Sequence, residues 1–183
     1  MSATDSLPLV LSRTVAVVGL GYAAGIAGGI PLWTLPALTS HPSISADSRL
    51  HIWDTVYKRG KTFMVSVLPT TSLLLAYASY AARPPLAYLP HSWVGLHRKA
   101  ILGVASALTL SVVGWTVIKM EKLNHHLMDV QKSLHKGPAS PAEIAAKNDT
   151  DNKILGRWNA LHNVRCVVLA TAFVLATTEL AFA

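Results

Sequence analysis

The fold of this 183-residue chain follows from one stretch, TFMVSVLPTTSLLLAYASYAA, at residues 62–82. The stretch lies between Lys61 and Arg83 and contains no Asp, Glu, Lys or Arg over 21 residues. At about 1.5 Å per residue, a helix of this length crosses a hydrocarbon core about 30 Å thick. The sequence therefore predicts a membrane-spanning helix at this position.

Three more segments of the chain lack charged residues in the same way. The uncharged stretch between Lys99 and Lys119 holds 19 residues, and an N-terminal apolar stretch covers about residues 14–38. The fourth uncharged segment has only 13 residues, between Arg165 and Glu179. Its helix can cross the membrane if these two charges lie near opposite interfaces. We expect one all-α domain, an integral membrane four-helix bundle, with spans at about 14–38, 62–82, 100–119 and 162–182 and a polar loop at 120–160.

The composition agrees with this fold class. The hydrophobic fraction is 51% and the mean hydropathy is +0.39, which is ordinary for a small polytopic protein. A single cysteine, Cys166, excludes a disulfide framework and a CxxC redox pair. The net charge of +7 is interpreted as charge bias between loops and not as a nucleic-acid surface.

The Lys and Arg residues divide unevenly between the two sides of such a bundle. Twelve of the sixteen belong to the first and third loops or their flanks, and the other side has Arg13, Arg83, Arg98 and Lys99. Because cytosolic loops carry the positive excess, we expect loops one and three in the cytosol, in the endoplasmic reticulum or another endomembrane. We also expect short helices in these loops, a helix start around Pro141 and a turn in NDTDNK at 148–153.

The first apolar stretch contains TVAVVGLGYAAG at 14–25, which imitates a dinucleotide-binding fingerprint. That fingerprint needs a βαβ unit, whereas here the apolar run simply continues toward residue 38. The run is also longer than the usual apolar core of a signal peptide, so we expect a retained span. Gly21, Gly25 and Gly29 share one helical stripe, which predicts close packing against another helix.

The most informative polar motif is RWNALHNVR at 157–165, which runs directly into the fourth span. Trp158, His162 and Arg165 follow at i, i+4 and i+7, so a helix places them on one face. Ionisable residues just inside a span are functional candidates. The structural alternative is that Arg165 reaches lipid phosphates while Trp158 is an ordinary interfacial aromatic residue.

Two further clusters lie on the same predicted side of the membrane. The third span ends in a stripe that includes Thr116, Met120 and Asn124, and WDTVYKRGKTF with Trp53 and Tyr57 precedes the second span. The structural alternative for Asn124 is an amide that bonds to a neighbouring helix end. The convergence of three clusters on one side favours a site.

Together these motifs resemble the fungal anthrone oxygenase family of small four-span membrane proteins. The resemblance covers nearly the whole chain: a Gly-rich first span, W-x3-Y-x2-G, T-x3-M-x3-N-x2-L and, most specific, W-x3-H-x2-R. It implies oxidation of a hydrophobic polyketide-derived anthrone to an anthraquinone, with O2 as co-substrate.

The residue types suit that chemistry. Anthrones form electron-rich enolates that pass an electron to O2 without metal or flavin, so the protein needs a base and an oxyanion stabiliser. We expect His162 as the base, since an unperturbed imidazole has a pKa of about 6.5, with Arg165 and Asn124 stabilising the oxyanion. Trp158 is expected to stack on the ring system. The remaining predicted substrate contacts are Tyr57 or Trp53 at the pocket mouth, Met120 and Thr116.

No motif for haem, flavin, nicotinamide, iron or another metal is present, so we expect no cofactor. The partners expected are the anthrone and the lipid bilayer, with no nucleic acid and with a homo-oligomer left open. The alternative function is a non-catalytic scaffold or carrier in a secondary-metabolite pathway, and a third option is a metal- or haem-dependent oxidase.

Overall fold

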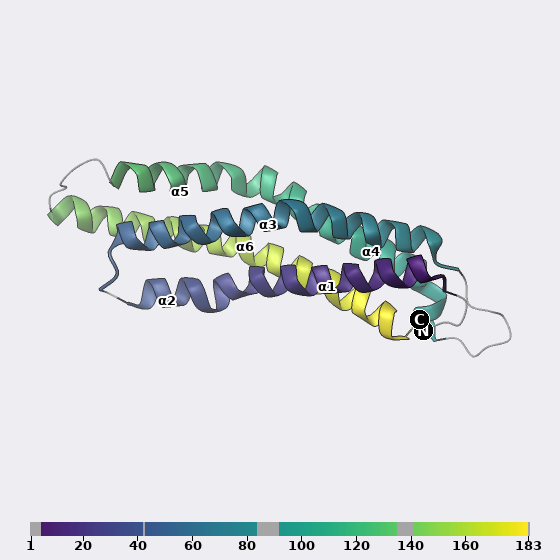
Figure 1. Ribbon diagram of the computed structural model, residues 1–183. Helices are drawn as coiled ribbons and strands as arrows, with labels where there is room; N and C mark the ends of the chain where they lie inside the picture. Colours follow the sequence, from purple (N-terminus) through teal and green to yellow (C-terminus); the bar gives the residue numbers. More distant parts are fainter. Residues whose placement is uncertain (1–4, 42, 84–91, 135–140, 183) are drawn as a thin grey trace.

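The computed structural model describes residues 5–41, 43–83, 92–134 and 141–182 (Figure 1). Within these residues all regular structure is helical, which confirms the all-α prediction. Four long helices result, because the π-helical turns η1 and η2 continue α1 into α2 and α4 into α5. The elements are α1 (Leu7–Gly29), η1 (Ile30–Thr34), α2 (Leu35–Ser40), α3 (Ala46–Ala81), α4 (Trp93–Trp115), η2 (Thr116–Met120), α5 (Glu121–Leu134) and α6 (Pro141–Phe182).

The long helices form a bundle in which α1 and α4 each pack against both α3 and α6. The start of α1 and the end of α6 lie together at one end of the bundle (Figure 1). The other end, called the α5 end below, contains α2, α5 and the first turns of α3 and α6 (Figure 1). The motifs from the second, third and fourth predicted spans therefore meet near the α5 end.

Among the described residues, four helical segments are long and apolar enough to cross a membrane: Leu7–Ser40, Asp47–Ala81, Trp93–Lys132 and Asn152–Phe182. They extend beyond the predicted spans, and much of the polar stretch predicted as a loop at 120–160 is helical. The turn predicted at 148–153 is wrong, because α6 begins at Pro141, as predicted, and continues through these residues. Extending an existing helix adds a hydrogen bond per residue, which outweighs the weak turn preference of NDTDNK.

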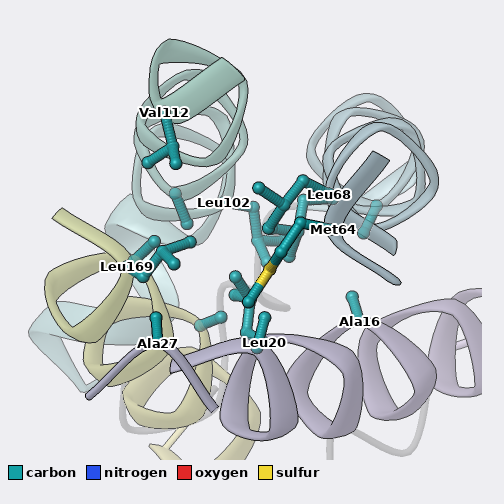
Figure 2. Close-up of a cluster of buried hydrophobic side chains, with 14 of the residues drawn as sticks. Ala16, Leu20, Ala27, Met64, Leu68, Leu102, Val112 and Leu169 are labelled. Atoms are coloured by element: carbon teal, nitrogen blue, oxygen red, sulfur yellow. The ribbon is translucent and has the colours of Figure 1, made fainter. Parts of the chain in front are cut away.

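Two buried clusters hold the bundle together along its length. The larger one lies between α1, α3, α4 and α6, where side chains from all four helices point toward a common centre (Figure 2). The smaller one is at the α5 end and is built around Trp53, Met120, Leu127 and Trp158. The interval between the two clusters is where a cavity opens.

The glycine stripe predicted on α1 is only partly correct. A Cβ atom added to Gly21 would lie 2.9 Å from Cε2 of Phe173 in α6, whereas Gly25 has no neighbour within 4 Å. Gly29 meets only Trp33, one turn farther along its own helix. The closely packed face of α1 is formed instead by buried residues at helical spacing, Ala16, Leu20, Ala23 and Ala27.

These two glycines give a matched test of the packing. We expect Gly21→Leu to lower the stability of the bundle by about 1–3 kcal/mol, because the new side chain collides with Phe173. Gly25→Leu is expected to change the stability by less than about 0.5 kcal/mol. Thermal unfolding in detergent compares them, and equal melting temperatures for the two variants would contradict this packing.

The end of the bundle away from α5 contains a buried network of four charges that the sequence analysis did not predict. Arg13 contacts Asp5 at 2.6 Å and Glu179 at 3.2 Å. Arg98 contacts the same two carboxylates at 2.8 and 3.1 Å. All four side chains are at most 5% exposed. The network joins α1, α4 and α6, and it fixes the segment that precedes α1.

Candidate functional site

A cavity of about 260 Å³ lies between the two buried clusters, and all four long helices contribute to its wall. Its volume is near the lower limit of small-molecule sites, which is about 300 Å³. The wall is mostly apolar with a few converging polar groups, as such sites usually are. Six of the eight predicted site residues line it: Tyr57, Thr116, Asn124, Trp158, His162 and Arg165.

The imidazole of His162 is fixed on both sides. Its Nε2 atom lies 2.9 Å from the carbonyl oxygen of Ala27 in α1, and its ring stacks on Trp158 with centroids 4.7 Å apart. A carbonyl oxygen can only accept, so Nε2 carries the proton and Nδ1 has a free lone pair. Nδ1 is buried and has no hydrogen-bond partner among the described residues. The site therefore contains an imidazole whose orientation is fixed and whose Nδ1 atom can accept a proton.

Trp158 lies at the centre of an aromatic and amide cluster. Its Nε1 atom donates to Oδ1 of Asn124 at 2.8 Å, and its ring meets Trp53 edge to face with centroids 5.6 Å apart. Because Oδ1 accepts this bond, the Nδ2 group of Asn124 is the donor that remains. The Tyr57 hydroxyl interacts with the Asn124 side chain, and the Tyr57 ring stacks on Trp53 at 5.2 Å.

Arg165 introduces a permanent cation beside the imidazole. It is 9% exposed, and its only hydrogen bond among the described residues is a weak one of 3.6 Å from Nη1 to Sδ of Met120. Its Nε atom is buried without a partner among the described residues. Buried donors normally have partners, so the unpartnered Nε of Arg165, whose side chain lines the cavity, is a donor that could serve a ligand acceptor.

Two predicted residues lie behind the cavity wall. Trp53 is 2% exposed and supports Trp158, so of the two aromatic residues predicted for the pocket mouth only Tyr57 lines the cavity. Met120 is fully buried in the cluster at the α5 end and touches Arg165. The rim carries charged side chains that were not predicted as site residues, including Lys61 and Glu121.

The contribution of α1 was also not predicted. Ile26 and Ala27 of α1 and Ile30 of η1 line the cavity, and Ala27 provides the carbonyl that orients His162. Among the described residues, no three His, Cys, Asp or Glu side chains are placed to hold a metal ion together.

A family profile described as anthrone oxygenase matches residues 53–175. The protein belongs to the anthrone oxygenase family. The resemblance inferred from the sequence motifs is thereby confirmed. No curated protein and no solved structure shows significant similarity to the chain.

The match to the anthrone oxygenase family covers the part of the chain that supplies most of the site. All eight predicted site residues lie within it, whereas α1 with Ala27 lies outside it. Family membership indicates oxidation of anthrone-type substrates. The four membrane-length helices of the described residues are consistent with a membrane protein.

Proposed function

We propose that this protein is a cofactor-independent anthrone oxygenase that converts a polyketide-derived anthrone to an anthraquinone with O2. One observation carries the proposal: the free Nδ1 of His162 and the unpartnered Nε of Arg165 belong to neighbouring side chains on the wall of one apolar cavity. A base beside a permanent cation is what formation of an enolate requires. The family match supports the substrate class.

In the first step, His162 takes a proton from the methylene carbon of the anthrone. The resulting enolate places negative charge on the ketone oxygen, where the Arg165 guanidinium group and the Asn124 amide donor stabilise it. The orientation of the imidazole stays fixed during this transfer, because Ala27 holds Nε2–H and Trp158 covers one ring face.

In the second step, the enolate gives one electron to O2, and the two radicals join at the former methylene carbon to form a peroxide. The proton held by His162 passes to this peroxide and gives a hydroperoxide. Loss of the last C–H proton from the same carbon, with cleavage of the O–O bond, forms the new carbonyl group and releases water. The balance is anthrone plus O2 to anthraquinone plus water, so no external reductant is consumed.

The test is oxidation of emodin-type anthrones by membranes containing the protein under ¹⁸O2, followed by mass spectrometry. We expect anthraquinone formation above the spontaneous rate in control membranes, with one labelled oxygen atom in the product. Binding of anthrone without acceleration would favour the carrier function. A Soret band, or stoichiometric iron or copper required for turnover, would favour the metal- or haem-dependent alternative.

The orientation of the site in the membrane follows from the charge bias. The positive-inside rule supports a cytosolic α5 end in an endomembrane. Anthrones partition into the bilayer, so entry to the cavity from the lipid side avoids transfer of the apolar rings through water.

Arg165→Lys separates the charge of Arg165 from its geometry. Lysine keeps the cation but loses the planar fork of donors, so a charge that develops on the substrate oxygen is stabilised less well. We expect kcat to fall by about tenfold or more while KM changes by less than about threefold. Steady-state kinetics measure the split, and a higher KM with an unchanged kcat would assign Arg165 to substrate binding alone.

A further inference from the structure

The hydrogen bond that orients His162 depends on an irregularity in the helix opposite. In an uninterrupted α-helix the carbonyl oxygen of residue 27 accepts from the N–H of residue 31. Residue 31 is proline, which has no N–H. The Ala27 oxygen accepts instead from the N–H of Ile30 and from Nε2 of His162. These two bonds occupy both lone pairs of the carbonyl oxygen.

The chain around Pro31 has adapted to the missing donor. Residues Ile30–Thr34 form the π-helical turn η1, in which Leu35 N–H reaches back to the oxygen of Ile30. Turns of this kind inside α-helices occur often at functional sites. Here the turn begins at Ile30, three residues after the Ala27 carbonyl that contacts His162, and Ile30 lines the cavity. Pro31 itself does not line the cavity, so any effect on the reaction passes through Ala27.

We propose that Pro31 is a positioning residue: by leaving the Ala27 oxygen without its helical donor, it reserves this acceptor for Nε2–H of His162. The imidazole is then held as the tautomer whose free nitrogen is Nδ1. An N–H at position 31 would give the Ala27 oxygen three donors for two lone pairs. His162 is the donor most easily displaced, because its side chain can rotate and a helical amide cannot.

The expected effect of Pro31 on catalysis rests on the proposed function, whereas its expected effect on the tautomer of His162 does not. The first measurement is therefore ¹⁵N NMR of protein labelled at histidine, with the His162 signals assigned by their loss in His162→Gln. We expect a single Nε2–H tautomer of His162 in the wild type and a mixture of tautomers in Pro31→Ala. Pro36→Ala is the matched control, since Pro36 is an exposed proline of α2 that neither lines the cavity nor precedes a contact with His162.

The second measurement is the kinetics of anthrone oxidation. Loss of a group that orients a catalytic side chain lowers activity about 10–100-fold. We expect a decrease of this size in kcat for Pro31→Ala, with KM within about twofold of wild type because the cavity wall is unchanged. Pro36→Ala should match the wild type in both parameters.

A third variant separates the missing donor from the rigidity of the proline ring. Lactic acid incorporated at position 31 gives an ester, which lacks the N–H as proline does but has no ring. We expect it to keep the wild-type tautomer and kcat. An ester variant that behaves like Pro31→Ala would overturn the proposal in favour of ring rigidity.

An unchanged tautomer and kcat in Pro31→Ala would overturn the proposal outright. If wild-type membranes do not accelerate anthrone oxidation, the proposed function fails while the NMR comparison still decides whether Pro31 controls His162.

Discussion

His162→Ala is expected to lower the rate of anthrone oxidation at neutral pH by about 10²–10⁴-fold, the usual contribution of a positioned general base. The structure gives the reason, because the free Nδ1 atom of His162 is the only nitrogen of that side chain not already bonded to the protein. The variant is expected to bind the anthrone with similar affinity, since the rest of the cavity wall remains.

The pH dependence distinguishes a lost base from a damaged fold. Hydroxide in solvent ionises the anthrone at high pH, so the rate of His162→Ala should rise with pH and approach that of the wild type. His126→Ala is the matched control, because His126 is an exposed histidine of α5 that does not line the cavity. Identical pH–rate profiles for wild type and His162→Ala would remove the general-base role and leave the fold intact.

Short-range spacing was sufficient to predict one face of the site. Trp158, His162 and Arg165 follow at i, i+4 and i+7. In a continuous helix this spacing alone places them on one face. The pairing of Asn124 with this face followed from the sequence as well, because the third and fourth spans are joined by one loop and meet at the same depth. Both predictions depend only on helix geometry and chain order.

The partner of His162 could not be predicted in the same way. Four apolar helices of similar composition do not encode which of them lie side by side, and α1 has few polar residues to indicate its neighbours. The signal that was available is Pro31, because a proline inside a span leaves the carbonyl oxygen four residues earlier without a donor. For Pro31 this carbonyl oxygen is that of Ala27, and the alanine side chain gives no indication of a functional role.

The same limit explains the errors on the glycine stripe and on Trp53. The spacing of Gly21, Gly25 and Gly29 identifies a face of α1 but not which of these positions a neighbour reaches, and Gly25 faces open space. Trp53 precedes a span as an interfacial tryptophan does, yet α5 and the extended start of α6 cover it. The length of those helices was underestimated because polar residues were assigned to a loop.

Removing the buried carboxylate of Asp5 is expected to cause the largest loss of stability. Asp5→Asn leaves Arg13 and Arg98 with Glu179 as their only remaining acidic contact among the described residues. Breaking a buried charge pair on one side typically costs about 3–5 kcal/mol, because the partner charge stays buried and uncompensated. Asp129→Asn is the control: that side chain is 72% exposed, and its pair with Lys132 is worth at most about 1 kcal/mol.

The effect of Asp5→Asn should also depend on pH in a defined direction. Burial alone would raise the pKa of Asp5, but hydrogen bonds and charges from Arg98 and Arg13 together lower that pKa below its ordinary value of 3.8. A carboxyl group with a lowered folded pKa stabilises the fold fully above the ordinary value and loses this contribution as pH falls through the folded pKa. The difference in melting temperature between wild type and Asp5→Asn in detergent should therefore be constant from about pH 5 to 7 and shrink below about pH 4. A difference that is independent of pH down to about pH 2 would show that Asp5 acts through packing and not through its charge.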